Sequence, residues 1–247
     1  MYACDQVDTN AEENLPVTLQ CVLVGSDGIL IATDTRVMHI PQRESQSPPR
    51  VRGAEAGSRK IVFDDSRTLA IACSGGEMGY SFAEPLMSEI ARIWQNGQSS
   101  RDVESFLHQQ WELIADKVEV TLILAGSNRE DILKVVLKES GEVRRSAFGR
   151  DLLGRIWLIA GDVFNPAGML LDRYLPKERV PVGKLKLLAA HYILTGNDLN
   201  TSAVEGLAIC IAKDGQPFSW VSDSGLASLK RKSQELHIYT RERLFEG

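Results

Sequence analysis

A threonine and an aspartate near the start of the chain could do nucleophilic chemistry together. Thr18 opens one apolar run, and Asp34 directly follows the next. Asp27 and Gly28 lie between the two runs, and Asp-Gly in that position is a strong signal for a β-hairpin. The hairpin over residues 18–36 would bring a hydroxyl nucleophile beside a carboxylate, and the rest of the chain should supply their partners.

The elements that position these groups are predicted from apolar periodicity and turn residues. Strands joined mostly by hairpins should form antiparallel sheets. Two such sheets packed face to face, with helices on each outer side, would bury every apolar face. This predicts an α+β fold, a four-layer αββα sandwich. After the first hairpin the expected strands are 60–63, 68–73, 118–125, 132–138, 143–146, 155–160, 206–212 and 218–221, and the expected helices are 78–94, 101–118, 166–174 and 181–194.

Three segments lie outside the predicted sandwich. Residues 1–17 are interpreted as a leader, and 39–59, rich in Pro, Ser, Gln, Arg and Gly, as a long surface loop that is either functional or disordered. Residues 227–247 are interpreted as a polar C-terminal tail. The interval 18–226 is predicted to be one domain without an internal repeat.

Composition excludes several classes of partner. The chain has 247 residues, of which 43% are hydrophobic, enough to fill a core. A net charge of −5 without a long Lys/Arg run argues against nucleic acid or an anionic membrane as a partner. The cysteines form no CxxC pair and share no metal-ligand spacing with histidine, so neither a metal nor a cofactor is predicted.

The cysteines and the N-terminal segment favour the cytoplasm. Cys21, Cys73 and Cys210 lie in apolar, strand-like runs, where buried reduced thiols are expected. Residues 1–17 are polar and acidic and lack the apolar stretch of a secretory signal. No apolar run approaches the roughly 20 residues that a membrane helix needs.

Four short motifs follow one another in the chain. The first is the hairpin of Thr18 and Asp34, with Gly28 in its turn. The others are a lysine after the long loop, a glycine-bearing turn and an acidic motif ahead of a hairpin, namely Ser58-Arg59-Lys60-Ile61, Ser74-Gly75-Gly76 and Asp198-Leu199-Asn200-Thr201. In order and spacing they resemble the proteasome β-subunit branch of the N-terminal nucleophile (Ntn) hydrolases, over most of the chain from Thr18 to Leu226.

The resemblance implies that Thr18 is a nucleophile. A threonine hydroxyl reacts poorly at neutral pH and needs an adjacent base. An α-amino group, with an ordinary pKa of about 7.7–8, is such a base, but only if residues 1–17 are removed. Lys60 would lie near Thr18 and favour its alkoxide-like state, and Asp34 would pair with Lys60 and hold it as an ammonium.

The remaining matched residues would complete the site. By the same resemblance, Gly75 would offer its backbone N–H to the oxyanion of the tetrahedral intermediate. Asp198 and the hydroxyl of Thr201 would orient the amine of the nucleophile. Cys73 and Met38 would border the specificity pocket, which the small Cys73 should leave roomy and apolar.

Two departures from the family pattern concern processing. Val17 stands where these subunits usually have Gly, and a β-branched residue should hinder self-cleavage before Thr18. Gly161 and Asp162 align with an accessory serine and offer no hydroxyl. Thr201 replaces another serine conservatively.

The leading prediction is a threonine endopeptidase that assembles into a ring and hydrolyses peptides or unfolded proteins in an enclosed chamber. Its partners would be copies of itself or related subunits, together with an ATP-dependent unfoldase. A non-catalytic structural subunit of such a ring and an Ntn amidase acting on a small amide are the alternatives. Taken singly, each residue has an ordinary role: a β-forming threonine, a turn aspartate, a solvated lysine and a turn glycine.

Overall fold

The computed structural model describes residues 18–36, 60–95, 100–128, 132–148, 157–161, 165–199 and 205–245. Residues 1–17 and 39–59, interpreted above as a leader and a surface loop, lie outside these ranges, as do Met38 and Thr201. The strands are β1 (Leu19–Val24), β2 (Gly28–Thr33), β3 (Ile61–Phe63), β4 (Leu69–Cys73), β5 (Val120–Gly126), β6 (Ile132–Leu137), β7 (Val143–Phe148), β8 (Trp157–Gly161), β9 (Ala208–Lys213) and β10 (Ser219–Trp220). The helices are α1 (Gly76–Gln95), α2 (Ser100–Glu112), α3 (Gly168–Tyr174), α4 (Val182–Leu199) and α5 (Asp223–Phe245).

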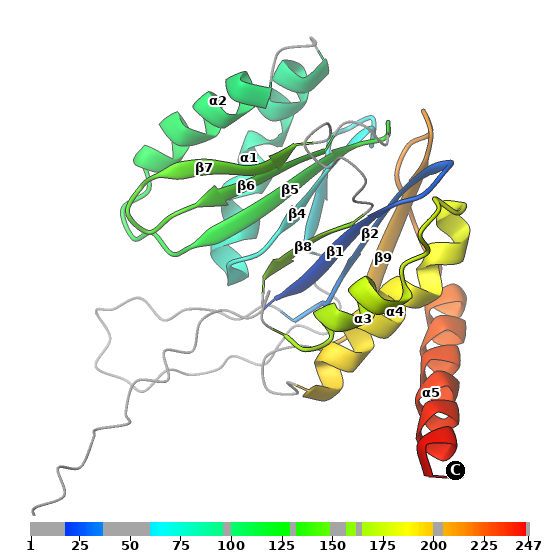
Figure 1. The fold of residues 1–247 in the computed structure, drawn as a ribbon. Coiled ribbons are helices and arrows are strands. Elements are labelled where there is room, and N and C mark those ends of the chain that lie inside the picture. The colour runs from blue at the N-terminus through cyan, green and yellow to red at the C-terminus, as the bar shows by residue number, and fades with distance from the viewer. Residues whose placement is uncertain are drawn as a thin grey trace, which may run out of the picture.

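The strands form two five-stranded sheets, in the orders β10-β9-β2-β1-β8 and β3-β4-β5-β6-β7. Each neighbouring pair in these orders is antiparallel. Helices α1 and α2 cover the outer face of the second sheet, and α3 and α4 cover the first (Figure 1). A third apolar layer lies between the two sheets. The predicted four-layer αββα sandwich is therefore confirmed.

The first hairpin forms as predicted, but Gly28 serves a different purpose from the one expected. Residues Gly25 to Asp27 connect the strands, and Gly28 begins β2. A Cβ at Gly28 would lie 2.2 Å from the carbonyl oxygen of Ala212, so glycine allows β9 to approach β2 closely. The Asp27 carboxylate accepts a 2.7 Å hydrogen bond from the backbone N–H of Val182 and so caps helix α4.

Helix boundaries differ from the predictions at three places. Helix α2 ends at Glu112, well before the predicted end at residue 118. Helix α4 continues to Leu199, beyond the predicted end at Leu194. Most of the predicted polar tail belongs to α5, which packs on the outer side of α4 (Figure 1) through Leu226 and Leu229.

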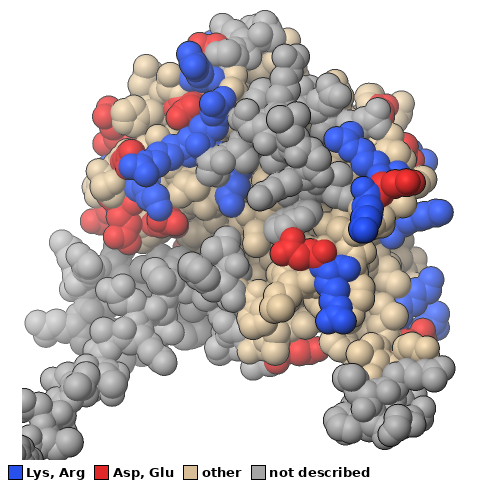
Figure 2. All heavy atoms as spheres, viewed as in Figure 1, with Lys and Arg blue, Asp and Glu red and all other residues tan. Residues whose placement is uncertain are grey.

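The surface carries charges of both signs. On the face shown in Figure 2, acidic and basic side chains of the described residues are intermingled. Exposed ion pairs include Lys138 with Glu119 at 2.6 Å, and pairs of this kind contribute little stability. Among the described residues, none of the helices combines the length and the apolar character needed to cross a membrane.

We expect Cys21, Cys73 and Cys210 to resist alkylation in the native protein. All three are free and buried, as predicted, and burial raises the pKa of each thiol. The reactive thiolate is therefore scarce at pH 8. Treatment with iodoacetamide followed by peptide mass mapping should find these sites unmodified until the chain is unfolded. Rapid modification of any of the three in the folded protein would contradict their burial in the core.

Candidate active site

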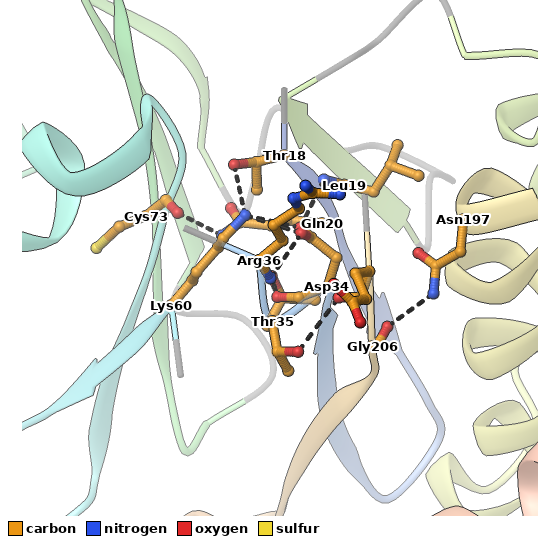
Figure 3. Close-up of polar contacts among 12 residues, drawn as sticks. Thr18, Leu19, Gln20, Asp34, Thr35, Arg36, Lys60, Cys73, Asn197 and Gly206 are labelled. Atoms are coloured by element: carbon orange, nitrogen blue, oxygen red, sulfur yellow. Dashed lines mark hydrogen bonds and ion pairs between the residues drawn. The ribbon is translucent and has the colours of Figure 1, made fainter. Parts of the chain in front are cut away.

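Three side chains from three strand ends meet at one end of the sandwich. Thr18 directly precedes β1, Asp34 directly follows β2, and Lys60 directly precedes β3 of the other sheet. The Lys60 Nζ lies 2.9 Å from Thr18 Oγ1 and 2.9 Å from each carboxylate oxygen of Asp34 (Figure 3). The hairpin therefore brings the predicted hydroxyl and carboxylate together, and the lysine bridges them from the second sheet.

The backbone holds the Asp34 carboxylate in place. Its Oδ1 accepts a hydrogen bond from the N–H of Leu19 at 3.0 Å, and its Oδ2 accepts one from the N–H of Arg36 at 3.2 Å. The N–H of Asp34 in turn donates to the carbonyl of Leu19 at 3.0 Å. With both oxygens held by backbone and lysine, the carboxylate has little freedom to rotate, and Lys60 is oriented toward Thr18.

The cluster is withdrawn from solvent. Thr18 and Asp34 are fully buried and Lys60 is 2% exposed. Burial lowers the pKa of the Lys60 ammonium, and Coulombic attraction to Asp34 opposes this shift. Burial likewise raises the pKa of the Asp34 carboxyl, against the effect of Lys60. The lysine is therefore a stronger proton donor to Thr18 Oγ1 than an exposed lysine would be.

The turn after β4 needs its glycines. Gly75 and Gly76 have φ values of +92° and +65°, in the left-handed region. A Cβ at Gly75 would lie 2.7 Å from a methyl carbon of Val120. Ser74 ties this turn to β5, because its N–H donates to the carbonyl of Thr121 at 2.9 Å and its Oγ accepts from the N–H of Thr121 at 3.0 Å. Backbone at Gly75 is thus held in a conformation that other residues rarely adopt.

Other predicted site residues are placed elsewhere. Cys73 is buried with its side chain in the core beneath α1, so only its backbone faces the cluster. Asp198 is exposed in the last turn of α4, and it does not occur among the described contacts of Thr18, Asp34 and Lys60. The reason is the longer helix, which places Asp198 near His191 on the side facing α5.

The structure adds two residues to the site, Gln20 and Gly161, for which the sequence predicted no role there. Gln20 is fully buried on β1, and its Nε2 donates a 2.6 Å hydrogen bond to the carbonyl of Cys73 (Figure 3). A polar residue two positions after Thr18, inside an apolar strand, was the available signal. Gly161 pairs with Leu19 across β8 and β1 at φ +87°. A Cβ there would lie 1.7 Å from the carbonyl oxygen of Thr18.

We expect Gly161→Ala to destabilise the protein and disturb the backbone of Thr18. The added methyl overlaps the Thr18 carbonyl, and overpacking of this kind costs about 1–3 kcal/mol in addition to the strain at positive φ. Gly215→Ala is the matched control, because Gly215 has φ +71° and a Cβ added there would meet no atom within 4 Å. Urea unfolding should show a larger loss for Gly161→Ala. Equal losses would mean that the contact with Thr18 is unimportant.

Among the described residues, no group of three or more His, Cys, Asp or Glu side chains is placed to hold a metal ion. The chemistry available to the cluster is that of a hydroxyl, an ammonium and a carboxylate. Such a set can stabilise negative charge on the hydroxyl oxygen and so activate it as a nucleophile.

The sequence and the structure were compared with those of known proteins, and only the structural comparison gives a match. No protein-family model matches the chain, and no curated protein matches its sequence. Among solved structures, Anbu (ancestral beta-subunit) from Yersinia bercovieri has a similar fold, with a TM-score of 0.62 at 13% identity. The similarity covers 90% of this chain and 95% of the other. At this identity the likeness concerns the fold alone, and it agrees with the four-layer αββα architecture described above.

Proposed function

We propose that this chain is a threonine-type hydrolase that cleaves peptide bonds, with Thr18 as its nucleophile after residues 1–17 are removed. The observation that carries the proposal is the position of Lys60 Nζ, 2.9 Å from Thr18 Oγ1 and from both oxygens of Asp34. The ammonium of Lys60 has three N–H donors, and Thr18 Oγ1 is an acceptor for it in addition to the two oxygens of Asp34. Its contact with a strand-end threonine is the arrangement that a hydroxyl nucleophile requires.

The proposed reaction is acyl transfer in two steps. Thr18 Oγ1 attacks the substrate carbonyl carbon while its proton passes to the freed α-amine, which then protonates the leaving amine. Lys60 donates a hydrogen bond to Oγ1 and stabilises its developing negative charge, and Asp34 keeps Lys60 in place. The N–H of Gly75 is proposed to bind the oxyanion. Water then hydrolyses the ester on Thr18 and restores the hydroxyl.

Assembly into a ring belongs to the same proposal. The similar structure is named as a β-subunit, and this supports an assembly of the present chain with copies of itself or related subunits. Peptides or unfolded proteins are the proposed substrates, and an ATP-dependent unfoldase is the proposed partner. Enclosure of the sites in a chamber would restrict hydrolysis to chains that have been unfolded.

A second candidate is a non-catalytic structural subunit of such a ring. Two observations favour it. Thr18 is fully buried, so a substrate cannot reach its hydroxyl without a rearrangement. Val17 precedes Thr18, and a β-branched residue disfavours the strained backbone that self-cleavage needs.

Intact mass combined with a peptide β-lactone, which acylates nucleophilic hydroxyls, separates the two candidates. For a threonine hydrolase we expect a chain that begins at Thr18 and a single adduct that peptide mapping places on Thr18. Thr121 provides an internal comparison, because it is another buried threonine at a strand position. Retention of residues 1–17 under all conditions, together with no adduct on Thr18, would overturn the hydrolase and leave the structural subunit.

A further inference from the structure

Gln20 is a buried amide at the centre of the candidate site. It lies on the same face of β1 as Thr18, because side chains two positions apart on a strand point the same way. It is fully buried, and its Nε2 donates a 2.6 Å hydrogen bond to the carbonyl of Cys73 in the other sheet. The contact joins positions 53 residues apart in sequence.

The orientation of this amide is set by its partner. A carbonyl oxygen accepts hydrogen bonds and cannot donate them, so the NH2 group of Gln20 must face Cys73. Its Oε1 then points away, and no donor among the described residues reaches it. A methionine of similar size would fill the same space without burying an unpaired acceptor. What glutamine adds at this position is the bond to Cys73.

That bond holds the turn that carries Gly75. Cys73 ends β4, and Ser74 and Gly75 follow directly. The turn is tied to β5 by Ser74 within its own sheet. The hydrogen bond from Gln20 connects the turn to the other sheet, which carries Thr18. The N–H of Cys73 also donates to the carbonyl of Lys60 at 2.9 Å, so the same residue connects the turn to the lysine.

We propose that Gln20 is a positioning residue that sets the place of the Gly75 turn relative to Thr18 Oγ1. This role rests on the proposed function, since it concerns where the oxyanion donor lies with respect to the nucleophile. Donors of this kind act only within a narrow range of distance. A shift of about 1 Å can lower a rate about 10²-fold. Gln20 acts through the turn and does not contact the reacting atoms.

The first test is Gln20→Met, which keeps the volume and removes the hydrogen bond. We expect kcat for a fluorogenic peptide to fall about 10- to 100-fold, with KM changed little, because oxyanion binding matters in the transition state. The matched control is Leu23→Met, a buried position on the opposite face of the same strand, where kcat should stay near that of the wild type.

The second test uses the acidic variant Gln20→Glu. A protonated glutamic acid can donate to the Cys73 carbonyl, whereas its carboxylate cannot, and burial raises the pKa of such a group. We expect the ratio of Gln20→Glu to wild-type activity to rise as the pH falls, while the ratio for Gln20→Met stays flat. A role in packing alone would produce no such difference between the two profiles.

Hydrogen exchange on the full-length chain decides the inference independently of activity. Amides of the segment 73–76 should exchange faster in Gln20→Met than in wild type. In Leu23→Met their exchange rates should equal those of the wild type. Exchange and kcat in Gln20→Met that match the Leu23→Met control would overturn the inference. If the wild type hydrolyses no peptide, the proposed function fails, and hydrogen exchange alone then tests the role of Gln20. Faster exchange of segment 73–76 in Gln20→Met would show that Gln20 positions the turn, and unchanged exchange would show that it does not.

Discussion

Thr18→Ala should lower kcat/KM for peptide hydrolysis at least about 10⁴-fold, the scale seen when a nucleophile that acts with its partners is removed. Alanine removes the Oγ1 that accepts a hydrogen bond from Lys60 at 2.9 Å. The fold should persist, because Lys60 keeps both contacts with Asp34. We expect a loss of about 1.5–3 kcal/mol in the free energy of unfolding, the usual scale for one hydrogen bond to a charged group.

Thr18→Ser is the matched control for that measurement. Serine keeps a hydroxyl in the same place and loses only a methyl group, so activity should remain measurable. Intact masses recorded beside the kinetics would show whether residues 1–17 are still attached in each variant. Undiminished hydrolysis by Thr18→Ala would rule out Thr18 as the nucleophile, whatever the state of the leader.

Lys60→Met should cost both stability and activity. It leaves the carboxylate of Asp34 fully buried without its cation, and breaking a buried pair in this way costs about 3–5 kcal/mol. Activity should fall because no ammonium then stabilises charge on Thr18 Oγ1. Urea unfolding and peptide hydrolysis measure the two effects separately.

The double variant Lys60→Met/Asp34→Leu distinguishes the two roles of the pair. Replacing both charges by apolar side chains removes the unpaired carboxylate, so the free energy of unfolding should return toward that of the wild type. Activity should stay as low as in Lys60→Met. A double variant that regains activity together with stability would show that the lysine serves the fold and has no part in the chemistry.

Local patterns account for the parts of the fold that could be predicted. The apolar alternation and the Asp27-Gly28 pair led to the first hairpin, because the contacts within a hairpin are short in sequence and its turn limits the register. The same reasoning placed Thr18 and Asp34 at one end. Lys60 was assigned by resemblance, since nothing in its neighbourhood of the sequence shows which strand end it will face.

Helix α4 shows how tertiary contacts overrule a local signal. Gly196 and Asn197 ordinarily indicate the end of a helix. In the folded chain a Cβ at Gly196 would lie 1.9 Å from Leu19, so glycine is needed for close packing of α4 on β1. The Asn197 side chain donates to the carbonyl of Gly206 at 3.0 Å, which anchors the last turn. The helix therefore continues and carries Asp198 toward α5.

Patterns in the chain were enough to establish the αββα class, the hairpin and the placement of a hydroxyl and a carboxylate at one end of that hairpin. The assembled fold was needed to show that Gln20 reaches Cys73 and that Gly161 lies against Thr18. Both contacts join strands that are distant in sequence. Their geometry depends on how the two sheets pack on each other and on how β8 pairs with β1, and no local periodicity predicts that arrangement.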